Sequence, residues 1–453
     1  MSSLLLKNLK AVVTCDANDT VLRGVDIFCE DGKIAAIGEN LNRTADRVID
    51  GSYLLCYPGL INTHHHFYQI FSRNLPQVQG LQLFDWLTAL YTIWEKLDAE
   101  VICLSSQCAL AALMKSGCTT AFDHHYVFPG NSSLDLLDAQ FAAADALGAR
   151  MVASRGSMNL SKKDGGLPPD SVVQSTDAIL KDSQRAVEKY HDSAFGAMHN
   201  VALAPCSPFS ASSDLYRESA KLARSLGVRL HTHLCETLDE ENYTLSAFGM
   251  RPLAYMQSLD FIGSDVWYAH GIHFNDEELK TLADTGTGVA HCPASNMKLA
   301  SGAARIPEML QLGVPVSLAV DGSASNDGSD LLQETRLGYL LGRVKYGDDA
   351  PTAYDYLKIA TNGGARVLGR EDIGSVEVGK CADLFMVDSR RLDIVGAAYS
   401  PENLPAAVGF SGAVDYTIVN GKITVENGRL TMIDEEKLAF DSERKIREYL
   451  SVQ

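Results

Sequence analysis

The chain has 453 residues, of which 46% are hydrophobic and 21% are charged, a composition typical of an ordinary globular protein. Its 39 Lys and Arg against 57 Asp and Glu give a net charge of −18, which disfavours binding to nucleic acid or to an anionic membrane. No run approaches the roughly 20 apolar residues that a membrane span requires. The first residues, MSSLLLKNLK, hold too short an apolar stretch for a signal peptide, so we expect a cytoplasmic protein.

Both ends of the chain have the pattern of short β-strands. Residues 1–58 alternate apolar and polar positions between Gly and Asp-Gly turns, and residues 373–435 do the same, with Asn-Gly turns at 420–421 and 427–428. We therefore expect one small discontinuous β-sandwich domain, built from 1–58 and 373–435. Residues 436–453 are predicted to form a C-terminal helical segment.

The middle of the chain, residues 59–372, alternates apolar runs with segments of helical periodicity. Eight runs are predicted to be strands: 59–66, 117–125, 149–156, 200–207, 228–234, 265–271, 287–293 and 315–322. Eight such units in succession favour an α/β fold, a (β/α)8 TIM barrel that carries the catalytic site. The alternative, a doubly wound sheet, would normally show a Gly-rich dinucleotide turn, and GTGVAH at 286–291 lacks the third glycine.

Nearly every predicted strand ends in a group that can bind metal or react. The groups are His64, His66, His124, Cys206, His233, His270, His291 and Asp321. All twelve histidines lie between His64 and His291, whereas histidine used as surface filler would be spread more evenly. In a barrel the carboxyl ends of the strands converge on one mouth, where such enzymes hold their catalytic residues.

Two pairs of histidines are spaced to share one face of a strand. His64 and His66 lie two residues apart, so both are expected to point into the barrel and to hold one metal ion. His231 and His233 repeat this spacing on the fifth run. His233 lies nearer the mouth and is the better ligand, whereas His231 is expected to pack deeper and to be hydrogen-bonded.

Two carboxylates complete the predicted site. Asp321 ends the eighth run, where a buried carboxylate is costly unless it is paired or metal-bound. Three histidines and one aspartate leave a position open for water, as catalytic zinc requires, and such a metal lowers the pKa of water to roughly 7. Glu236 follows His233 by three residues and could act as general base. His270 and His291 are placed to hydrogen-bond the water or the substrate. Each could instead be a core histidine, and for His291 the two interpretations are about equal.

The ten cysteines form no C-x-x-C pair, so reduced thiols are expected rather than a disulfide framework or a structural zinc site. The zinc signature of cytidine deaminases, H-x-E with P-C-x-x-C, is absent, because Pro205-Cys206-Ser207-Pro208-Phe209 lacks the second cysteine. The metalloprotease signature H-E-x-x-H is absent too.

With these residues in view, the chain resembles the amidohydrolase superfamily, in the branch that holds guanine deaminases and triazine hydrolases. The matching stretches are PGLINTHHHFYQ (58–69), HTHLCET (231–237), AHGIHF (269–274), HCPASNMKL (291–299), VDGSASND (320–327) and GSVEVGKCADLFMVD (374–388). SRGSMNL and APCSPFS are most similar to the 8-oxoguanine deaminases of this family. The resemblance spans nearly the whole chain.

The resemblance also implies roles for individual residues. It implies His64, His66, His233 and Asp321 as metal ligands, with Asp321 also catalytic, Glu236 as proton shuttle and His270 as partner of the water on the metal. One metal is implied, because the fourth run lacks the lysine that bridges two metals in binuclear members. Gln69 would contact the substrate ring. Cys206 stands where guanine deaminases have an arginine. Arg155 and Tyr126 are further candidates for the pocket wall, with structural roles equally open.

The expected reaction is hydrolytic deamination of an amino-substituted purine-like ring, with 8-oxoguanine converted to uric acid and ammonia. Alternatives on the same site are isoxanthopterin, guanine or a hydroxytriazine, and an alternative of another class is a non-catalytic amidohydrolase-like scaffold. One divalent metal per chain is expected, zinc or else iron. The expected partners are a small heterocycle, water and further copies of the chain in a homo-oligomer.

Overall fold

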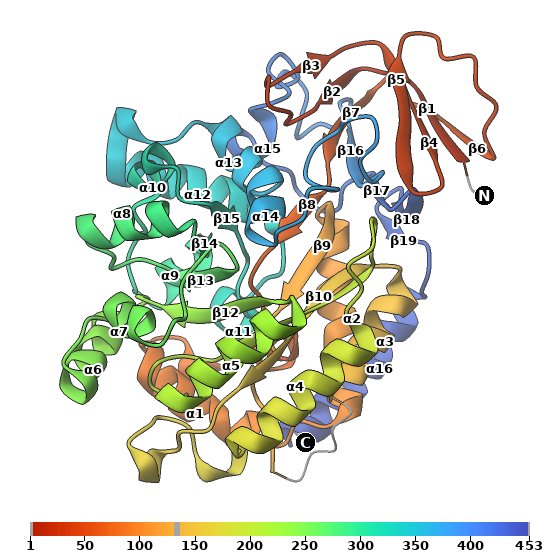
Figure 1. Cartoon of the computed structure of the whole chain (residues 1–453). Helices are drawn as coiled ribbons and strands as arrows, with labels where there is room; N and C mark the ends of the chain where they lie inside the picture. The colour runs from red at the N-terminus through yellow and green to blue at the C-terminus, as the bar shows by residue number, and fades with distance from the viewer. Residues whose placement is uncertain (1–2, 131–135, 452–453) are drawn as a thin grey trace.

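The computed structural model describes residues 3–130 and 136–451 (Figure 1). Its centre is one sheet of eight parallel strands that follow one another in chain order. The strands are β8 (Leu60–Asn62), β9 (Cys118–Asp123), β10 (Arg150–Ser157), β11 (His199–Pro205), β12 (Arg229–Leu234), β13 (Val266–His270), β14 (Gly288–His291) and β15 (Val316–Leu318). Each of the eight predicted runs overlaps one of these strands, which confirms the predicted barrel fold.

The barrel closes between its first and last strands through the segments that follow them. The backbone N–H of Asp321 donates to the carbonyl of His64 at 3.1 Å, and the N–H of Val320 donates to Oδ1 of Asn62 at 2.9 Å. Strands β8 and β15 are shorter than predicted, so His64, His66 and Asp321 lie beyond the strand ends. Their positions are therefore not set by side-chain alternation within a strand. The closing hydrogen bonds hold these segments at the mouth of the barrel.

Helices follow the strands and cover the outside of the barrel, as Figure 1 shows for α3, α4 and α5. The barrel helices are α1 (Leu83–Trp94), α2 (Ala99–Lys115), α3 (Leu136–Leu147), α4 (Thr176–Tyr190), α5 (Ser213–Leu226), α6 (Leu238–Phe248), α7 (Pro252–Ser258), α8 (Asp276–Thr285), α9 (Pro293–Lys298), α10 (Ile306–Leu312), α11 (Ser323–Asn326), α12 (Leu331–Tyr346), α13 (Ala353–Ile359) and α14 (Asn362–Val367). The short 3-10 helices are η1 (Phe67–Ser72), η2 (Pro76–Val78), η3 (Lys162–Asp164), η4 (Asp170–Val172) and η5 (Gly347–Asp349).

Helix α5 illustrates how the sequence determines these elements. The hydroxyl of Ser212 accepts the N–H of Leu215 and caps the first turn, and Gly227 ends the helix with a φ of 69°, a conformation that glycine adopts without steric cost. Leu215, Ala220 and Ala223 recur at helical spacing and are buried. The apolar face is thereby packed on the barrel strands.

Two further sheets are built from the chain ends (Figure 1). One has the order β5-β4-β1-β6 and the other β19-β18-β17-β16-β7-β2-β3. Their strands are β1 (Ser3–Leu9), β2 (Ala11–Val13), β3 (Val21–Leu22), β4 (Val25–Glu30), β5 (Lys33–Gly38), β6 (Arg47–Asp50), β7 (Leu54–Pro58), β16 (Leu384–Asp388), β17 (Tyr416–Val419), β18 (Lys422–Glu426) and β19 (Arg429–Leu430). Side chains of both sheets, among them Leu6, Ile27, Cys56, Met386 and Ile418, form one buried cluster. This is the predicted sandwich.

The turns predicted from the Asn-Gly pairs connect strands of the second sheet. Asn420 and Gly421 join β17 to β18 with φ values of 50° and 76°, and Asn427 and Gly428 join β18 to β19 with 52° and 74°. Positive φ at both central residues is what a tight hairpin turn requires. The two Asn-Gly pairs therefore form the tight turns that the sequence predicted.

The last helices are α15 (Leu404–Ala407) and α16 (Glu435–Leu450). Helix α16 packs against α2, where Lys445 forms ion pairs with Asp98 and Glu100. The division into 1–58 with 373–435, 59–372 and 436–453 stays a proposal. All ten cysteines are unpaired. No helix of the described chain combines the length and the apolar character that crossing a membrane requires.

Candidate metal and catalytic site

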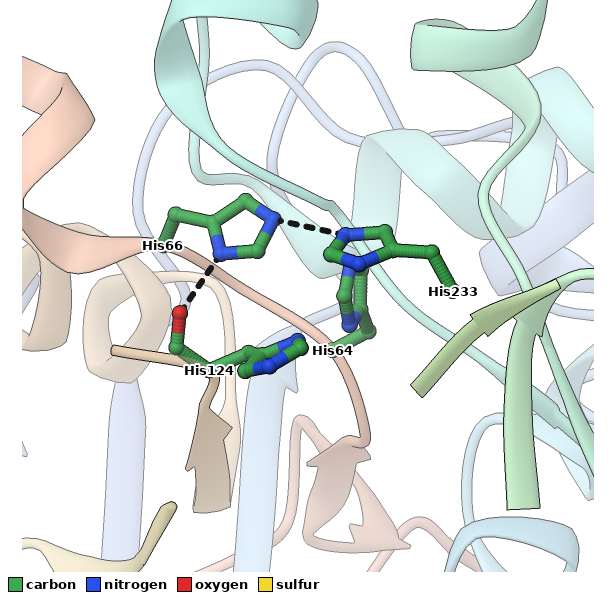
Figure 2. A group of neighbouring side chains, drawn as sticks. All are labelled: His64, His66, His124 and His233. Atoms are coloured by element: carbon green, nitrogen blue, oxygen red, sulfur yellow. Dashed lines mark hydrogen bonds between the residues drawn. The ribbon is translucent and has the colours of Figure 1, made fainter. Parts of the chain in front are cut away.

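Three imidazoles and one carboxylate meet at the mouth of the barrel. Nε2 of His66 lies 3.2 Å from Nε2 of His233, and Oδ1 of Asp321 lies 3.3 Å from Nε2 of both His64 and His66. Figure 2 shows the rings of His64, His66 and His233 turned toward one another, with His124 beside them. The structure thus brings together the four predicted metal ligands from segments far apart in the sequence.

Hydrogen bonds on the far side of each ring determine its tautomer. Nδ1 of His66 lies 2.7 Å from the carbonyl of His124 (Figure 2), and Nδ1 of His233 lies 2.7 Å from the carbonyl of Cys206. A carbonyl can only accept, so both Nδ1 atoms carry the hydrogen. Each Nε2 then presents a lone pair to the centre of the site.

A second histidine fixes His64 in the same tautomer, with its hydrogen on Nδ1. Nδ1 of His231 donates to the carbonyl of Trp267 at 2.9 Å, which leaves Nε2 of His231 to accept from Nδ1 of His64 at 2.8 Å. The prediction that His231 packs deeper and is hydrogen-bonded is confirmed. Such outer hydrogen bonds orient metal-binding imidazoles in other proteins.

The charge state of the four groups suits a divalent cation. Burial lowers the pKa of His64 to about 3 and holds the pKa of His233 well below its usual value, so both rings are neutral. Burial alone would raise the pKa of Asp321, but the close contacts with His64 and His66 hold it well below its usual value, so its carboxylate is ionised. The ring nitrogens turn their lone pairs toward one another and toward the anionic oxygen of Asp321. These atoms repel one another unless a cation lies between them. The residues therefore fit the metal implied by the sequence.

Glu236 and His270 lie beside this donor set. Oε2 of Glu236 is 3.5 Å from Nε2 of His270, and Oε1 has no hydrogen-bond partner among the described residues. Burial, assisted by the charge of Asp321, raises the pKa of Glu236 to about 8. A carboxyl group with a pKa near neutrality can both accept and return a proton, as a proton shuttle must.

A small cavity opens onto these groups. Its lining comprises His66, Gln69, Leu83, Trp86, Leu87, Tyr126, Cys206, Ser207, Phe209, His233, Glu236, His270, Leu299, Asp321 and Ser325. Leu83, Trp86, Leu87, Phe209 and Leu299 make much of the wall apolar. Burial raises the pKa of Cys206 to about 12, so its thiol is neutral.

The amide of Gln69 also lines this cavity. The side chain is buried, and neither Nε2 nor Oε1 has a hydrogen-bond partner among the described residues. It packs on Gly322, where a Cβ would lie 1.9 Å from Oε1 of Gln69. Because a buried amide without partners is costly, a ligand that offers both an acceptor and a donor would satisfy it.

Comparison with known proteins agrees with this geometry. A model of the amidohydrolase family matches residues 55–424, most of the chain. The chain belongs to the amidohydrolase family. This amidohydrolase is 43% identical to hydroxydechloroatrazine ethylaminohydrolase of Pseudomonas sp. strain ADP, across 97% of its own length and 94% of the relative. It is 42% identical to 8-oxoguanine deaminase of Pseudomonas aeruginosa PAO1, across 96% of each chain.

A solved structure shows the same likeness in three dimensions. The zinc complex of atrazine chlorohydrolase from Arthrobacter aurescens TC1 superposes with a TM-score of 0.95 at 32% identity, covering 98% of this chain and all of that one. The resemblance predicted from the motifs is thereby confirmed.

Two predicted pocket residues lie elsewhere in this amidohydrolase. The described residues that line the cavity include neither Arg155 nor His291. Arg155 is buried in an ion pair with Asp182 at 2.6 Å, and its guanidinium lies 3.7 Å from the ring centre of Phe128. Arg155 therefore has a structural role, because its charge is neutralised by helix α4. His291 is buried at the end of β14. Tyr126, Cys206, Gln69 and His270 do line the cavity.

Sequence reasoning missed two residues that hold the catalytic groups. Oδ1 of Asn296 lies 2.9 Å from Nδ1 of His270, and an amide oxygen can only accept, so Nε2 of His270 faces the site with its lone pair. The carboxylate of Glu240 accepts the N–H of Cys235 at 2.9 Å and of Glu236 at 3.0 Å. Asn296 lies within HCPASNMKL, so that stretch is a signal for it. Glu240 lies in the acidic stretch LDEE at 238–241, which looks like an exposed turn and gives no signal.

Proposed function

We propose that this amidohydrolase is a mononuclear metal-dependent aminohydrolase that converts 8-oxoguanine to uric acid and ammonia. The observation that carries the proposal is the cavity itself. It combines a donor set that needs a cation, a carboxyl group of pKa about 8 and an unpaired amide within one buried space. The likeness to an 8-oxoguanine deaminase supports 8-oxoguanine as the substrate.

His64, His66, His233 and Asp321 would hold the metal, zinc in this proposal and iron as the alternative. A metal ion so bound lowers the pKa of water to roughly 7 and so supplies a nucleophile at neutral pH. The neighbouring protein groups then orient the substrate and move protons.

The oxygen of water bonds to the ring carbon that bears the exocyclic amine, and the bond from that carbon to the amine breaks. Glu236 takes one proton of the water at its free Oε1 and passes it to the adjacent ring nitrogen. His270, fixed by Asn296, accepts a hydrogen bond from the water at Nε2. Asp321 helps to transfer the second proton to the departing amine, which leaves as ammonia. The ring keeps the oxygen as a carbonyl group.

Gln69 would recognise the ring edge. Its Nε2 can donate to a ring carbonyl while Oε1 accepts from the neighbouring ring N–H, the pair of groups that a lactam edge presents. Cys206 would contact a substituent as a neutral, weakly polar group. No charged side chain other than the catalytic carboxylates lines the cavity among the described residues, which suits an uncharged heterocycle.

The test of the shuttle role replaces Glu236 by Gln and measures ammonia release. The variant retains the shape of the side chain but cannot carry the proton, so we expect turnover to fall by about 100-fold or more. Turnover within about tenfold of the parent would show that Glu236 is not the shuttle. Metal content, measured on the same preparation, should be unchanged, because Glu236 is not proposed as a ligand.

A second candidate is an aminohydrolase of a hydroxytriazine that bears an alkylamino group. The apolar wall of Leu83, Leu87 and Leu299 favours it, because those side chains could cover an alkyl group. Measuring kcat/KM for 8-oxoguanine, guanine, isoxanthopterin and a hydroxytriazine decides among the substrates. Stoichiometric metal and any turnover would exclude a non-catalytic scaffold. A homo-oligomer and a cytoplasmic location stay predictions, the former open to sedimentation analysis.

A further inference from the structure

A second cavity lies at the opposite end of the barrel, where the strands begin. It has a volume of about 250 Å³, and its wall includes Val152 of β10, Trp267 of β13 and Arg229, the first residue of β12. We call it the lower cavity and define it by Val152, His191, Arg229, Trp267, Leu368 and Arg370. His233, one of the proposed metal ligands, lies at the other end of β12.

The lower cavity is cationic in a strongly acidic chain. Two arginines and one histidine line it, and none of its lining residues, all within the described chain, is Asp or Glu. The chain as a whole carries a net charge of −18. A cavity that holds cationic side chains and no carboxylate favours a negatively charged ligand, since a desolvated cation is stabilised by an opposite charge.

The two arginines differ in what they can offer to a ligand. Arg370 binds both oxygens of Asp372 at 2.7 Å, so its charge is already neutralised. Arg229 donates to the carbonyl of Ser264 from Nη2 at 2.5 Å, and its Nη1 makes no hydrogen bond among the described residues. Asp265, the carboxylate that acts on Arg229 electrostatically, is bound by Arg224 at 2.9 Å. Arg229 therefore has an unused donor.

His191 adds a second donor. Its Nδ1 accepts the N–H of Val201 at 3.1 Å, so the ring hydrogen of the neutral form is on Nε2. Burial lowers the pKa of His191, which favours that neutral form. Between these polar groups the wall is apolar: Val152, Trp267 and Leu368 belong to one buried cluster inside the barrel.

We propose that the lower cavity binds a small organic carboxylate, with the carboxylate at Nη1 of Arg229 and the apolar body against Val152, Trp267 and Leu368. The site is separate from the catalytic cavity. Arg229, His231 and His233 are every second residue of β12 and share one face of the strand. His231 lies between the other two, and its hydrogen bond with His64 belongs to the core that separates the lower cavity from the catalytic cavity. The proposal does not depend on the identity of the catalytic substrate.

Isothermal titration calorimetry of the metal-loaded protein tests the proposal with three probes. Benzoate has both the charge and the apolar body, phosphate has only a charge, and benzyl alcohol has only the apolar body. We expect benzoate to bind in the millimolar range or tighter and the other two more weakly. Equal binding of phosphate would show a plain anion site, and equal binding of benzyl alcohol would show that Arg229 is not used; either result overturns the proposal.

Variants locate the binding site. Arg229→Met should weaken benzoate binding by about tenfold or more, because a buried charge partner is lost. Arg366→Met is the matched control: Arg366 also donates to one backbone carbonyl, that of Gly313, but lines a different cavity. Ser193→Asp places a carboxylate at the exposed rim of the lower cavity with little risk to folding, and it should weaken binding too. Benzoate binding that survives both changes would belong to the catalytic cavity and would overturn the proposal.

Discussion

Oδ1 of Asn296 accepts the Nδ1 hydrogen of His270 at 2.9 Å. His270 is also held by its backbone, which has a φ of 73°, a value uncommon for a residue with a side chain. The two constraints fix the ring and its tautomer together, so that Nε2 points to Glu236. Asn296 is a positioning residue, since it acts on the reaction through His270.

Replacing Asn296 by Leu should lower kcat by about 10- to 100-fold, because His270 loses the acceptor that fixes its tautomer. KM and metal content should change little, since neither the ring-binding amide nor the metal ligands are altered. Steady-state kinetics and elemental analysis measure both. Asn296→Asp retains an acceptor and should recover part of the loss. A Leu variant with the parental kcat would contradict the assigned role.

Replacing His231 by Phe should weaken metal binding by about 10- to 100-fold, because Nδ1 of His64 then has no acceptor and the ring can adopt the wrong tautomer. Competition with a chelator measures the affinity directly, without reference to turnover. His199→Phe is the control, since His199 is partly exposed and pairs with Asp145. Equal affinities of the two variants would exclude a role for His231 in orienting His64.

Replacing Gln69 by Leu should lower kcat/KM for 8-oxoguanine by about 10- to 100-fold, because the ring edge would lose both hydrogen bonds. Gly322→Ala should have the same effect through a different residue, since its Cβ would displace the Gln69 amide. Gln79→Leu, at an exposed position, serves as the control. If both site variants kept the parental kcat/KM, Gln69 would not be the residue that reads the ring.

The stability of the protein should depend on pH through Glu334. Burial raises the pKa of this carboxyl group from 4.5 to about 8, although it accepts hydrogen bonds from Ala294 and Asn326. The folded state therefore binds the proton more tightly than the unfolded state. The contribution is fully present below pH 4.5 and is lost as the pH rises through about 8.

We therefore expect the parent to lose free energy of unfolding relative to Glu334→Gln as the pH is raised from about 5 to about 8. Urea unfolding at several pH values measures the difference, and comparing the two proteins cancels the pH dependence of metal binding that they share. Glu371→Gln, at an exposed position, should follow the parent. A constant difference between the parent and Glu334→Gln would show that Glu334 does not titrate in this range.

The strands could be predicted because each shows its apolar run and its terminal polar residue within about ten positions of sequence. Local spacing also indicated that His64, His66 and Glu236 gather at the mouth, although His64 and His66 lie beyond β8 and are held by the closing hydrogen bonds and not by alternation along a strand. Arg155 was not: its partner Asp182 lies on a helix 27 positions later, and no local pattern reveals that ion pair. Glu240 shows a different difficulty, because a buried acceptor of two backbone N–H groups has the same sequence pattern as an exposed acidic turn.

A single residue, Gly59, joins β7 to β8, and its N–H donates to the carbonyl of Asp383 at 2.9 Å. The loop with His64 and His66 therefore follows closely on β7, which pairs with β16 from a distant part of the chain. Asp383 also forms a buried ion pair with Arg150 of β10. We therefore expect the metal site to hold its ion only when β16 is paired with β7, so that loosening the β-sandwich should also release the ion.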